Sequence, residues 1–177
     1  MTHILLTISG HDRAGIVCDV AEALLDLKAN IADSSMTALR GRFTMMMIIS
    51  LAADQHLSDL KAAMAELERR TGLHVQSQII DEQDATRCAP DPDHIITVHG
   101  ADQIGIVHAV SATLTQLNVS IVDLSTQARH SDHGDIYMMV LEVVAGDQAE
   151  AMRTQLQETA QRIDVDIELH QLDDAII

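Results

Sequence analysis

Two kinds of hydrophobic period follow one another along the chain. Residues 4–9 form an apolar, β-prone run in which Leu6 and Ile8 share one side. Between residues 14 and 28 the apolar side chains instead recur at helical spacing, which places Cys18 on the expected buried side. These patterns predict a strand followed by an amphipathic helix, whose apolar positions are Ile16, Val17, Val20, Ala21, Leu24 and Leu27.

The alternation of strand and helix patterns continues to residue 80. Residues 29–39 and 43–51 are predicted strands, and Arg40-Gly41-Arg42 between them is typical of a tight hairpin. His56-Leu57-Ser58-Asp59 is expected to open a helix that ends near Gly72, a favourable residue for ending a helix. Residues 73–80 form a fourth strand, so the predicted order is β-α-β-β-α-β.

The second half of the chain repeats this order. Strands are expected at 95–99, 120–129, 135–144 and 165–172, and helices after residue 105 and at 147–162. Because Leu6 aligns with Ile96 and Leu24 with Leu114, the repeat indicates an internal duplication. The segment Phe43-Thr44-Met45-Met46 aligns with Ile136-Tyr137-Met138-Met139 if the second hairpin contains three extra residues.

The duplicated pattern predicts the fold class and the domain organisation. We expect an α+β protein of two tandem ferredoxin-like βαββαβ sandwiches, each an antiparallel sheet with helices on one face. The first domain is placed at residues 1–82 and the second at 94–177. Residues 83–93 form the expected linker, which is polar and contains both prolines.

One strand-to-helix loop occurs in both halves. It is Gly10-His11-Asp12-Arg13-Ala14-Gly15-Ile16-Val17 in the first half and Gly100-Ala101-Asp102-Gln103-Ile104-Gly105-Ile106-Val107 in the second. Glycines permit unusual backbone angles and let a ligand approach the main chain. The aspartate can cap the new helix, whose free N–H groups favour an anion. We therefore consider capping alone and ligand binding as compatible hypotheses for Asp12 and Asp102.

The charge of the chain excludes several classes of partner. The 11 Lys and Arg residues stand against 27 Asp and Glu residues, which gives a formal net charge of −16. Such a chain cannot assemble a basic face for direct contact with nucleic acid or with an anionic membrane. No apolar run reaches the roughly 18–20 residues of a membrane span, and Met1-Thr2-His3 leads straight into a strand without a signal peptide. We expect a cytoplasmic protein in which Cys18 and Cys88 remain reduced thiols.

No cofactor site or catalytic set can be assembled from the pattern. The segment His130-Ser131-Asp132-His133 could bind a metal ion, but it lies at an expected hairpin tip without a third ligand. We interpret it as a solvated turn and expect no metal. The histidines His11, His94 and His99 have no paired nucleophile, so we expect no enzyme activity.

The loop motif resembles that of the ACT domain. The segment Gly-x-Asp-x-x-Gly-Ile-Val, followed by Ala29-Asn30-Ile31-Ala32-Asp33-Ser34, is similar to the family pattern, and the resemblance covers nearly the whole chain as two tandem domains. A free-standing pair is similar to the family of the glycine cleavage system transcriptional repressor. Many relatives have proline before the second glycine, where this chain has Ala14 and Ile104.

The resemblance implies a regulatory protein that binds a small amino acid where one loop faces the start of the second strand of a neighbouring domain. It also implies a partner protein such as a transcription factor, and it leaves open an assembly module that binds no ligand. The candidate ligand-binding residues are Gly10, His11, Asp12, Arg13, Gly15 and Asn30 in the first copy and Gly100, Asp102, Gly105 and Ser120 in the second.

Both faces of the third strand are apolar. Met45, Met47 and Ile49 share one side, whereas Met46 and Ile48 share the other. A sheet covered by helices on one face usually has polar side chains on the face that meets water. We therefore expect the second face to be buried against another domain or a second chain, which makes the protein a homo-oligomer in the latter case.

Overall fold

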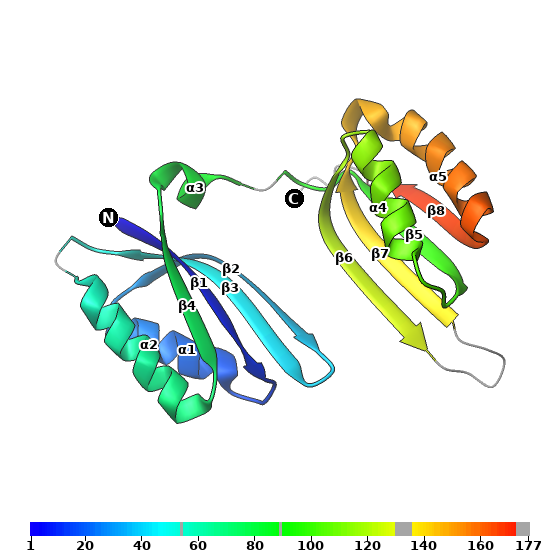
Figure 1. Ribbon diagram of the computed structural model, residues 1–177. Coiled ribbons are helices and arrows are strands. Elements are labelled where there is room, and N and C mark those ends of the chain that lie inside the picture. The colour runs from blue at the N-terminus through cyan, green and yellow to red at the C-terminus, as the bar shows by residue number, and fades with distance from the viewer. Residues whose placement is uncertain (54, 89, 130–135, 173–177) are drawn as a thin grey trace. The chain divides into compact units, whose positions relative to one another are not determined.

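The computed structural model describes residues 1–53, 55–88, 90–129 and 136–172. The chain divides into two units, Met1–Arg87 and Cys88–Ile177, each with its own sheet and helices (Figure 1). Each sheet is four-stranded and antiparallel, and the predicted α+β class with two tandem ferredoxin-like units is confirmed.

Unit 1 follows the predicted order of elements. They are β1 (Thr2–His11), α1 (Ile16–Asp26), β2 (Asn30–Leu39), β3 (Arg42–Leu51), α2 (Leu57–Thr71) and β4 (His74–Ile80). The spatial order of the strands is β2-β3-β1-β4, so β2 and β4 are the edges. A short helix, α3 (Glu82–Thr86), follows in a segment for which the sequence predicts no helix.

Local backbone chemistry explains where these elements end. Arg40 and Gly41 both have positive φ, 48° and 77°, which is the geometry of the two-residue turns that match the twist of a hairpin. Helix α2 ends where Gly72 takes a left-handed conformation and its N–H donates to the Glu68 carbonyl. The predicted hairpin and the predicted helix end are therefore confirmed.

The core of unit 1 lies between the two helices and one face of the sheet. In β3 the alternate residues Phe43, Met45, Met47 and Ile49 are buried, as the two-residue period predicts. Burial of each large aliphatic side chain contributes roughly 1.5–3 kcal/mol. The other members of the core are Ile4, Leu6, Ile8, Ile16, Val20, Leu24, Leu51, Leu60, Met64, Leu67 and Leu73.

Unit 2 repeats the architecture. Its elements are β5 (His94–Ala101), α4 (Ile106–Gln116), β6 (Ser120–Arg129), β7 (Ile136–Val144), the 3-10 turn η1 (Gly146–Gln148), α5 (Ala149–Ile163) and β8 (Val165–Gln171). The strand order is β6-β7-β5-β8.

The hypothesis of a metal site at His130 and His133 falls outside the described residues. None of the helices in the described ranges is long and apolar enough to cross a membrane.

Two sequence-based expectations are wrong. Phe43 lies opposite Gly10 in unit 1, and Tyr137 lies opposite Gly100 in unit 2, so Phe43 corresponds to Tyr137 rather than to Ile136. A slip of one residue exchanges the two faces of a strand, and the buried positions confirm the new alignment. Cys18 was expected on the buried side of α1, but it is exposed because only Ile16, Val20 and Leu24 of that helix are buried.

Asp93 joins three segments of unit 2. Its carboxylate accepts hydrogen bonds from the N–H groups of Ala145 and Gly146 at 2.8 and 2.7 Å, and it lies 2.8 Å from Nδ1 of His94. Partial burial alone would raise the pKa of the Asp93 carboxyl, but these donors lower it to about 2. Asp93 thus connects the start of β5 to the segment that leads from β7 into α5.

Gly10 and Gly100 occupy positions where two backbones approach closely. A Cβ atom at Gly10 would lie 2.6 Å from Cδ2 of Leu73, and one at Gly100 would lie 2.8 Å from Cγ1 of Val165. Leu73, which precedes the edge strand β4, fills this space in unit 1. Val165, which starts the edge strand β8, fills it in unit 2. The absence of a side chain at Gly10 and Gly100 therefore has a packing cause, whether or not a ligand approaches nearby.

We predict that Asp93→Asn destabilises unit 2 in a pH-dependent way. Because the pKa is lowered in the folded state, the stabilisation is present above about pH 5 and disappears as the pH falls toward 2. The side chain is 35% exposed, so water screens the interaction and we expect a loss of about 1 kcal/mol near neutral pH, well below the value for a buried group.

The experiment is urea unfolding followed by the fluorescence of Tyr137, the only tyrosine of the chain, between about pH 2 and pH 7. Asp91→Asn removes an equal charge from an exposed position two residues earlier and serves as the control. Equal losses in the two variants would contradict the role given to Asp93.

We also predict that Gly100→Ala costs more stability than Gly10→Ala. Val165 is branched at Cβ, and its Cβ lies 3.2 Å from the added atom. At Gly10 the Cα distance is the same, 3.4 Å, but the closest atom is Cδ2 at the far end of the Leu73 side chain, which can turn about two side-chain bonds. We expect about 1–3 kcal/mol for Gly100→Ala from urea unfolding. Gly100→Ala combined with Val165→Ala should recover much of the steric cost, and no recovery would contradict the packing explanation.

Candidate functional site

The loop between β1 and α1 is the site that both the motif and the fold single out. Residues 12–15 connect the central strand β1 to the first turn of α1. Gly15 precedes the helix in a left-handed conformation with φ 89°, and Gly105 does the same before α4 with φ 104°. These angles favour glycine, so both second glycines of the motif have a backbone cause.

Asp12 does not cap α1, contrary to one of the two sequence hypotheses. The N-cap residue is Gly15, and no side chain among the described residues caps the first turn by a hydrogen bond. The same holds for Gly105 and Asp102 in unit 2. The first helical hydrogen bond runs from the Asp19 N–H to the Gly15 carbonyl at 3.0 Å, so the preceding N–H groups have no partner inside the helix.

Arg13 is held by a network of charges around the first turn of α1. Its guanidinium pairs with the Asp19 carboxylate and donates to the Ala14 carbonyl at 3.1 Å. Arg70 of α2 lies 4.0 Å from Asp19 and 3.5 Å from Glu22. The Asp19 carboxylate, in the first turn of α1, interacts favourably with the helix dipole. The positive charge of Arg13 reduces the repulsion between Asp19 and any other anion at this helix start.

A hollow of about 120 Å³ opens beside this loop. Its polar side is formed by Asp12 and Arg13, and its apolar side by the helix start together with Met36 of β2 and Phe43 of β3. The Asp12 N–H donates to the Gly41 carbonyl at 2.9 Å, which ties the loop to the β2–β3 hairpin. The remaining residues around the hollow are Gly15, Ile16, Val17 and Cys18.

The other candidate residues of unit 1 lie at different distances from this hollow. His11 ends β1, and its Nε2 atom lies 3.0 Å from Nη1 of Arg42. Asn30 pairs with Ser50 at the opposite end of the sheet, where β1 begins. Eight residues of strand separate the two ends, which corresponds to about 27 Å. Within unit 1, therefore, Asn30 does not reach a ligand held by the loop.

The second copy keeps the backbone of the site but changes its side chains. Gln103 stands in place of Arg13, and its amide donates to the Ile163 carbonyl at 2.5 Å. Tyr137 replaces Phe43, and burial together with the nearby Asp102 carboxylate raises the pKa of its hydroxyl. Ser120 starts β6 as Asn30 starts β2, so its side chain is also far from its own loop.

Sequence reasoning missed the residues that surround the loop in space. Met36 and Phe43 come from strands distant in sequence, although the strand period places Phe43 on the face that holds the core. Asp19 and Arg70 had no sequence signal, because their contact depends on how α1 packs against α2. Among the described residues, no group of three or more His, Cys, Asp or Glu side chains could hold a metal ion.

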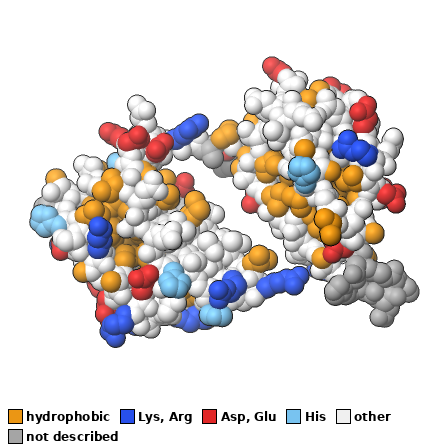
Figure 2. Space-filling view, in the orientation of Figure 1, with side chains coloured by type: hydrophobic (Ala, Val, Ile, Leu, Met, Phe, Trp, Pro, Cys, Tyr) orange, Lys and Arg blue, Asp and Glu red, His pale blue; other side chains and the backbone are white. Residues whose placement is uncertain are grey.

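Hydrophobic and charged side chains share the surface of each unit (Figure 2). Several large apolar residues are well exposed, including Met36 at 50% and Met46 at 50%. In strands β2 and β6 every residue is exposed. These two strands are edges of their sheets, so they present unpaired backbone groups as well as side chains to a neighbour.

Known proteins resemble this chain over one or both units. The ACT domain family model matches residues 2–78 and 93–170. A UPF0237 protein of Lactococcus lactis, YjhC, is 38% identical over 81 residues, which are 43% of this chain and 88% of that protein. A UPF0237 protein of Methanopyrus kandleri is 34% identical over 88 residues, which are 49% of this chain and 94% of that protein.

Two solved structures match both units. An unknown protein from Galdieria sulphuraria has a TM-score of 0.78 at 28% identity, over 97% of this chain and 99% of that one. A protein assigned as a glycine cleavage system transcriptional repressor has a TM-score of 0.74 over 98% of both chains, and at 18% identity this likeness shows the fold alone. Since the family model matches most of the chain in two consecutive segments, the chain belongs to the ACT domain family and contains two copies of the domain.

Proposed function

We propose that this chain is a non-enzymatic, cytoplasmic regulatory protein that binds a small amino acid at its β1–α1 loop and modulates a partner protein. The partner class that we propose is a transcriptional regulator of amino-acid metabolism, and of glycine metabolism in particular. The observation that carries the proposal is the uncapped start of α1, which lies beside the Asp12 carboxylate and the hollow in front of Phe43.

The chemistry of this loop suits a free amino acid. The N–H groups of the first turn of α1 can take a carboxylate, and the helix dipole favours it there. Arg13 already neutralises Asp19, so the negative charge of that residue does not repel the ligand. Asp12 is exposed, and its carboxylate can pair with the ligand ammonium group.

The second wall of the site is proposed to come from the start of β2 in a neighbouring ACT domain. Asn30 is exposed and offers both a donor and an acceptor to a ligand held by another domain. The shorter Ser120 at the equivalent place offers less reach, so sites that involve Asn30 are expected to bind more tightly. This arrangement requires a homo-oligomer or an equivalent contact between domains.

The charge of the chain supports action through a protein rather than through DNA. The net charge of −16 leaves no excess of basic side chains for the phosphate backbone. The likeness to a glycine cleavage system transcriptional repressor shows only the fold, so the connection to glycine metabolism is part of the proposal.

The second candidate function is an assembly module that binds no ligand. It is favoured by the edge strands β2 and β6, in which every residue is exposed. Such strands can pair with the edge of another sheet. This function needs neither Asp12 nor the open helix start, so ligand binding separates the two candidates.

We predict that the full chain binds a small amino acid and that Asp12→Asn weakens binding about 5- to 150-fold, or on the order of 1–3 kcal/mol, because the ammonium group loses its charged partner. Calorimetric titration with glycine, serine and the other amino acids measures this effect. Asn30→Ala should also weaken binding, whereas Asp26→Asn, at the other end of α1, should not.

If no amino acid binds the wild-type chain at about millimolar concentration, the assembly module becomes the better account. If binding occurs but Asp12→Asn and Asn30→Ala bind as well as the wild type, the ligand lies elsewhere.

We further predict that the purified chain does not bind duplex DNA at physiological salt, because its surface charge has the same sign as the phosphate backbone. An electrophoretic mobility assay tests this expectation over a range of salt concentrations. A salt-dependent shift at about micromolar protein or below would contradict it.

A further inference from the structure

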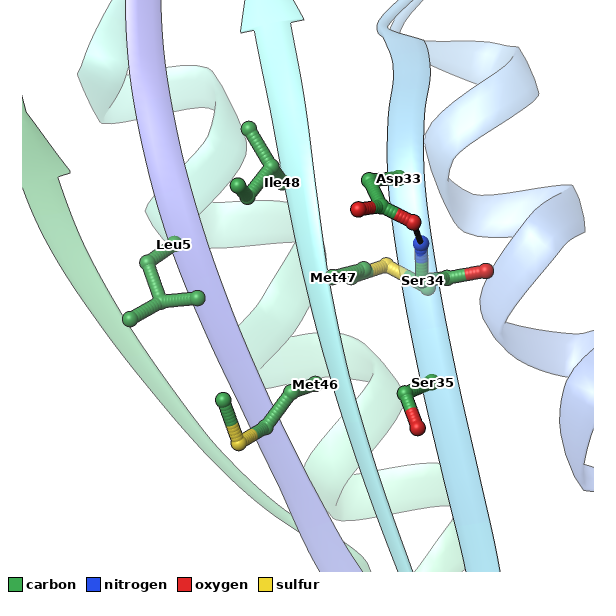
Figure 3. A pocket seen from close by; sticks show the side chains of 7 residues that line it. All are labelled: Leu5, Asp33, Ser34, Ser35, Met46, Met47 and Ile48. Atoms are coloured by element: carbon green, nitrogen blue, oxygen red, sulfur yellow. Dashed lines mark hydrogen bonds between the residues drawn. The ribbon is translucent and has the colours of Figure 1, made fainter. Parts of the chain in front are cut away.

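The sheet of unit 1 has a face that its helices do not cover, with an apolar centre among polar side chains. Figure 3 shows Leu5, Met46 and Ile48 projecting from this face, with the helices behind the sheet. They border a hollow of about 150 Å³ whose other residues are Asp33, Ser34, Ser35 and Met47. Met46 is 50% exposed, so this face of the isolated chain presents an apolar centre to water. We call it the open face of unit 1.

Two opposite charges lie at the two ends of this apolar centre. Arg42 starts β3 and contacts the His11 ring, whereas Asp33 of β2 lies opposite Ile48, six residues further along β3. The separation along the strand is therefore about 20 Å. Neither side chain forms an ion pair with another described residue, and the Asp33 carboxylate accepts a hydrogen bond from the Ser34 N–H at 2.7 Å.

The corresponding face of unit 2 has a different charge. Glu142 occupies the place of Ile48 and lies opposite Asp123, and β8 adds Asp166 and Glu168 to the same face. Arg129, opposite Ile136, is the one arginine or lysine among the described residues of this face, which therefore carries three more negative than positive charges. In unit 1 the strand β4 contributes only uncharged side chains and one histidine to this face, namely His74, Gln76, Gln78 and Ile80. Stacking the acidic face on a second copy of itself would bring eight carboxylates together with only two arginines, which is unfavourable.

The acidic face is also a poor match for the open face of unit 1. Together the two faces would bring five carboxylates against the two arginines Arg42 and Arg129. The five carboxylates are Asp33, Asp123, Glu142, Asp166 and Glu168. Three of these carboxylates would then be desolvated without a cationic partner, which is unfavourable. A second copy of the open face of unit 1 matches two carboxylates with two arginines around an apolar centre.

We propose that the chain forms a dimer through the open face of unit 1, with the two-fold axis running across the strands. This axis reverses the strand direction between copies, so Arg42 of each copy lies over Asp33 of the second copy. Leu5, Met46 and Ile48 of both copies then fill the centre. The proposed function already calls for a contact between domains, and the dimer goes beyond it by assigning the face and the axis of a contact that forms without an amino acid.

The size of the open face sets the expected affinity. Four strands about 4.8 Å apart, with about eight residues each, cover about 500 Å² on each copy. The total of about 1,000 Å² is near the lower limit for a specific interface, so a dissociation constant in the micromolar range is expected.

The alternative two-fold axis, along the strands, would bring Arg42 of one copy over Arg42 of the other. The repulsion between these two arginines therefore favours the axis across the strands.

The test is sedimentation of the full chain at about 1–100 μM, without ligand. Met46→Glu should weaken the dimer at least tenfold, because it places a carboxylate in the apolar centre. Val140→Glu is the matched control, since Val140 lies opposite Thr97 in unit 2 as Met46 lies opposite Thr7 in unit 1. Circular dichroism checks that both variants keep the wild-type fold.

A charge exchange tests the orientation. Arg42→Asp and Asp33→Arg should each weaken the dimer, and the double variant should restore it, because the exchanged charges face each other again. A wild-type chain that stays monomeric at about 100 μM overturns the proposal. It is also overturned if Val140→Glu dissociates the dimer as strongly as Met46→Glu. Failure of the double variant to restore the dimer overturns the axis across the strands.

Discussion

Burial of one face of each sheet beneath two helices is the interaction on which the other features of each unit depend. In unit 1 it requires Leu6 and Ile8 of β1 and Met45 and Met47 of β3 to point to the same side. That requirement fixes the strand register, because a slip of one residue would expose the whole set. The register in turn places the end of β1, and therefore the β1–α1 loop, beside Met36 and Phe43.

The two copies keep this arrangement and differ on the surfaces that it leaves free. Residues 1–87 contain 8 Lys and Arg against 12 Asp and Glu, whereas residues 88–177 contain 3 against 15, so their net charges are −4 and −12. Around the loop, Arg13 and Phe43 are replaced by Gln103 and Tyr137, and on the open sheet face Ile48 is replaced by Glu142. The core has kept its apolar character in both units, while the candidate contact surfaces have diverged.

The sequence was sufficient for the order of elements because hydrophobic periods report directly which side chains are buried. The hairpin at Arg40 and Gly41 was predictable for a similar reason, since few residue pairs adopt positive φ together. The alignment of Phe43 with Tyr137 was not predictable, because both faces of these strands are apolar and the two registers look alike in sequence.

The surroundings of the candidate site were also beyond the sequence. Whether Asp12 or Gly15 caps α1 depends on the path of three loop residues, and both alternatives suit the composition of the motif. Gly10 was read as a residue that admits a ligand, but its contact with Leu73 arises only once the loop before β4 packs over β1. The hydrogen bonds that Asp93 accepts join residues more than 50 positions apart, which no local sequence pattern indicates.

The claim at the centre of this account is that the β1–α1 loop of unit 1 receives an amino acid. The most direct measurement is the amide-resolved NMR spectrum of the full chain during titration with glycine. The account predicts that the N–H signals of Asp12, Gly15 and Ile16 shift together with those near Asn30, and more than those of Asp102 and Gly105. Shifts confined to other residues, or no shifts at about 10 mM glycine or any other small amino acid, would contradict it.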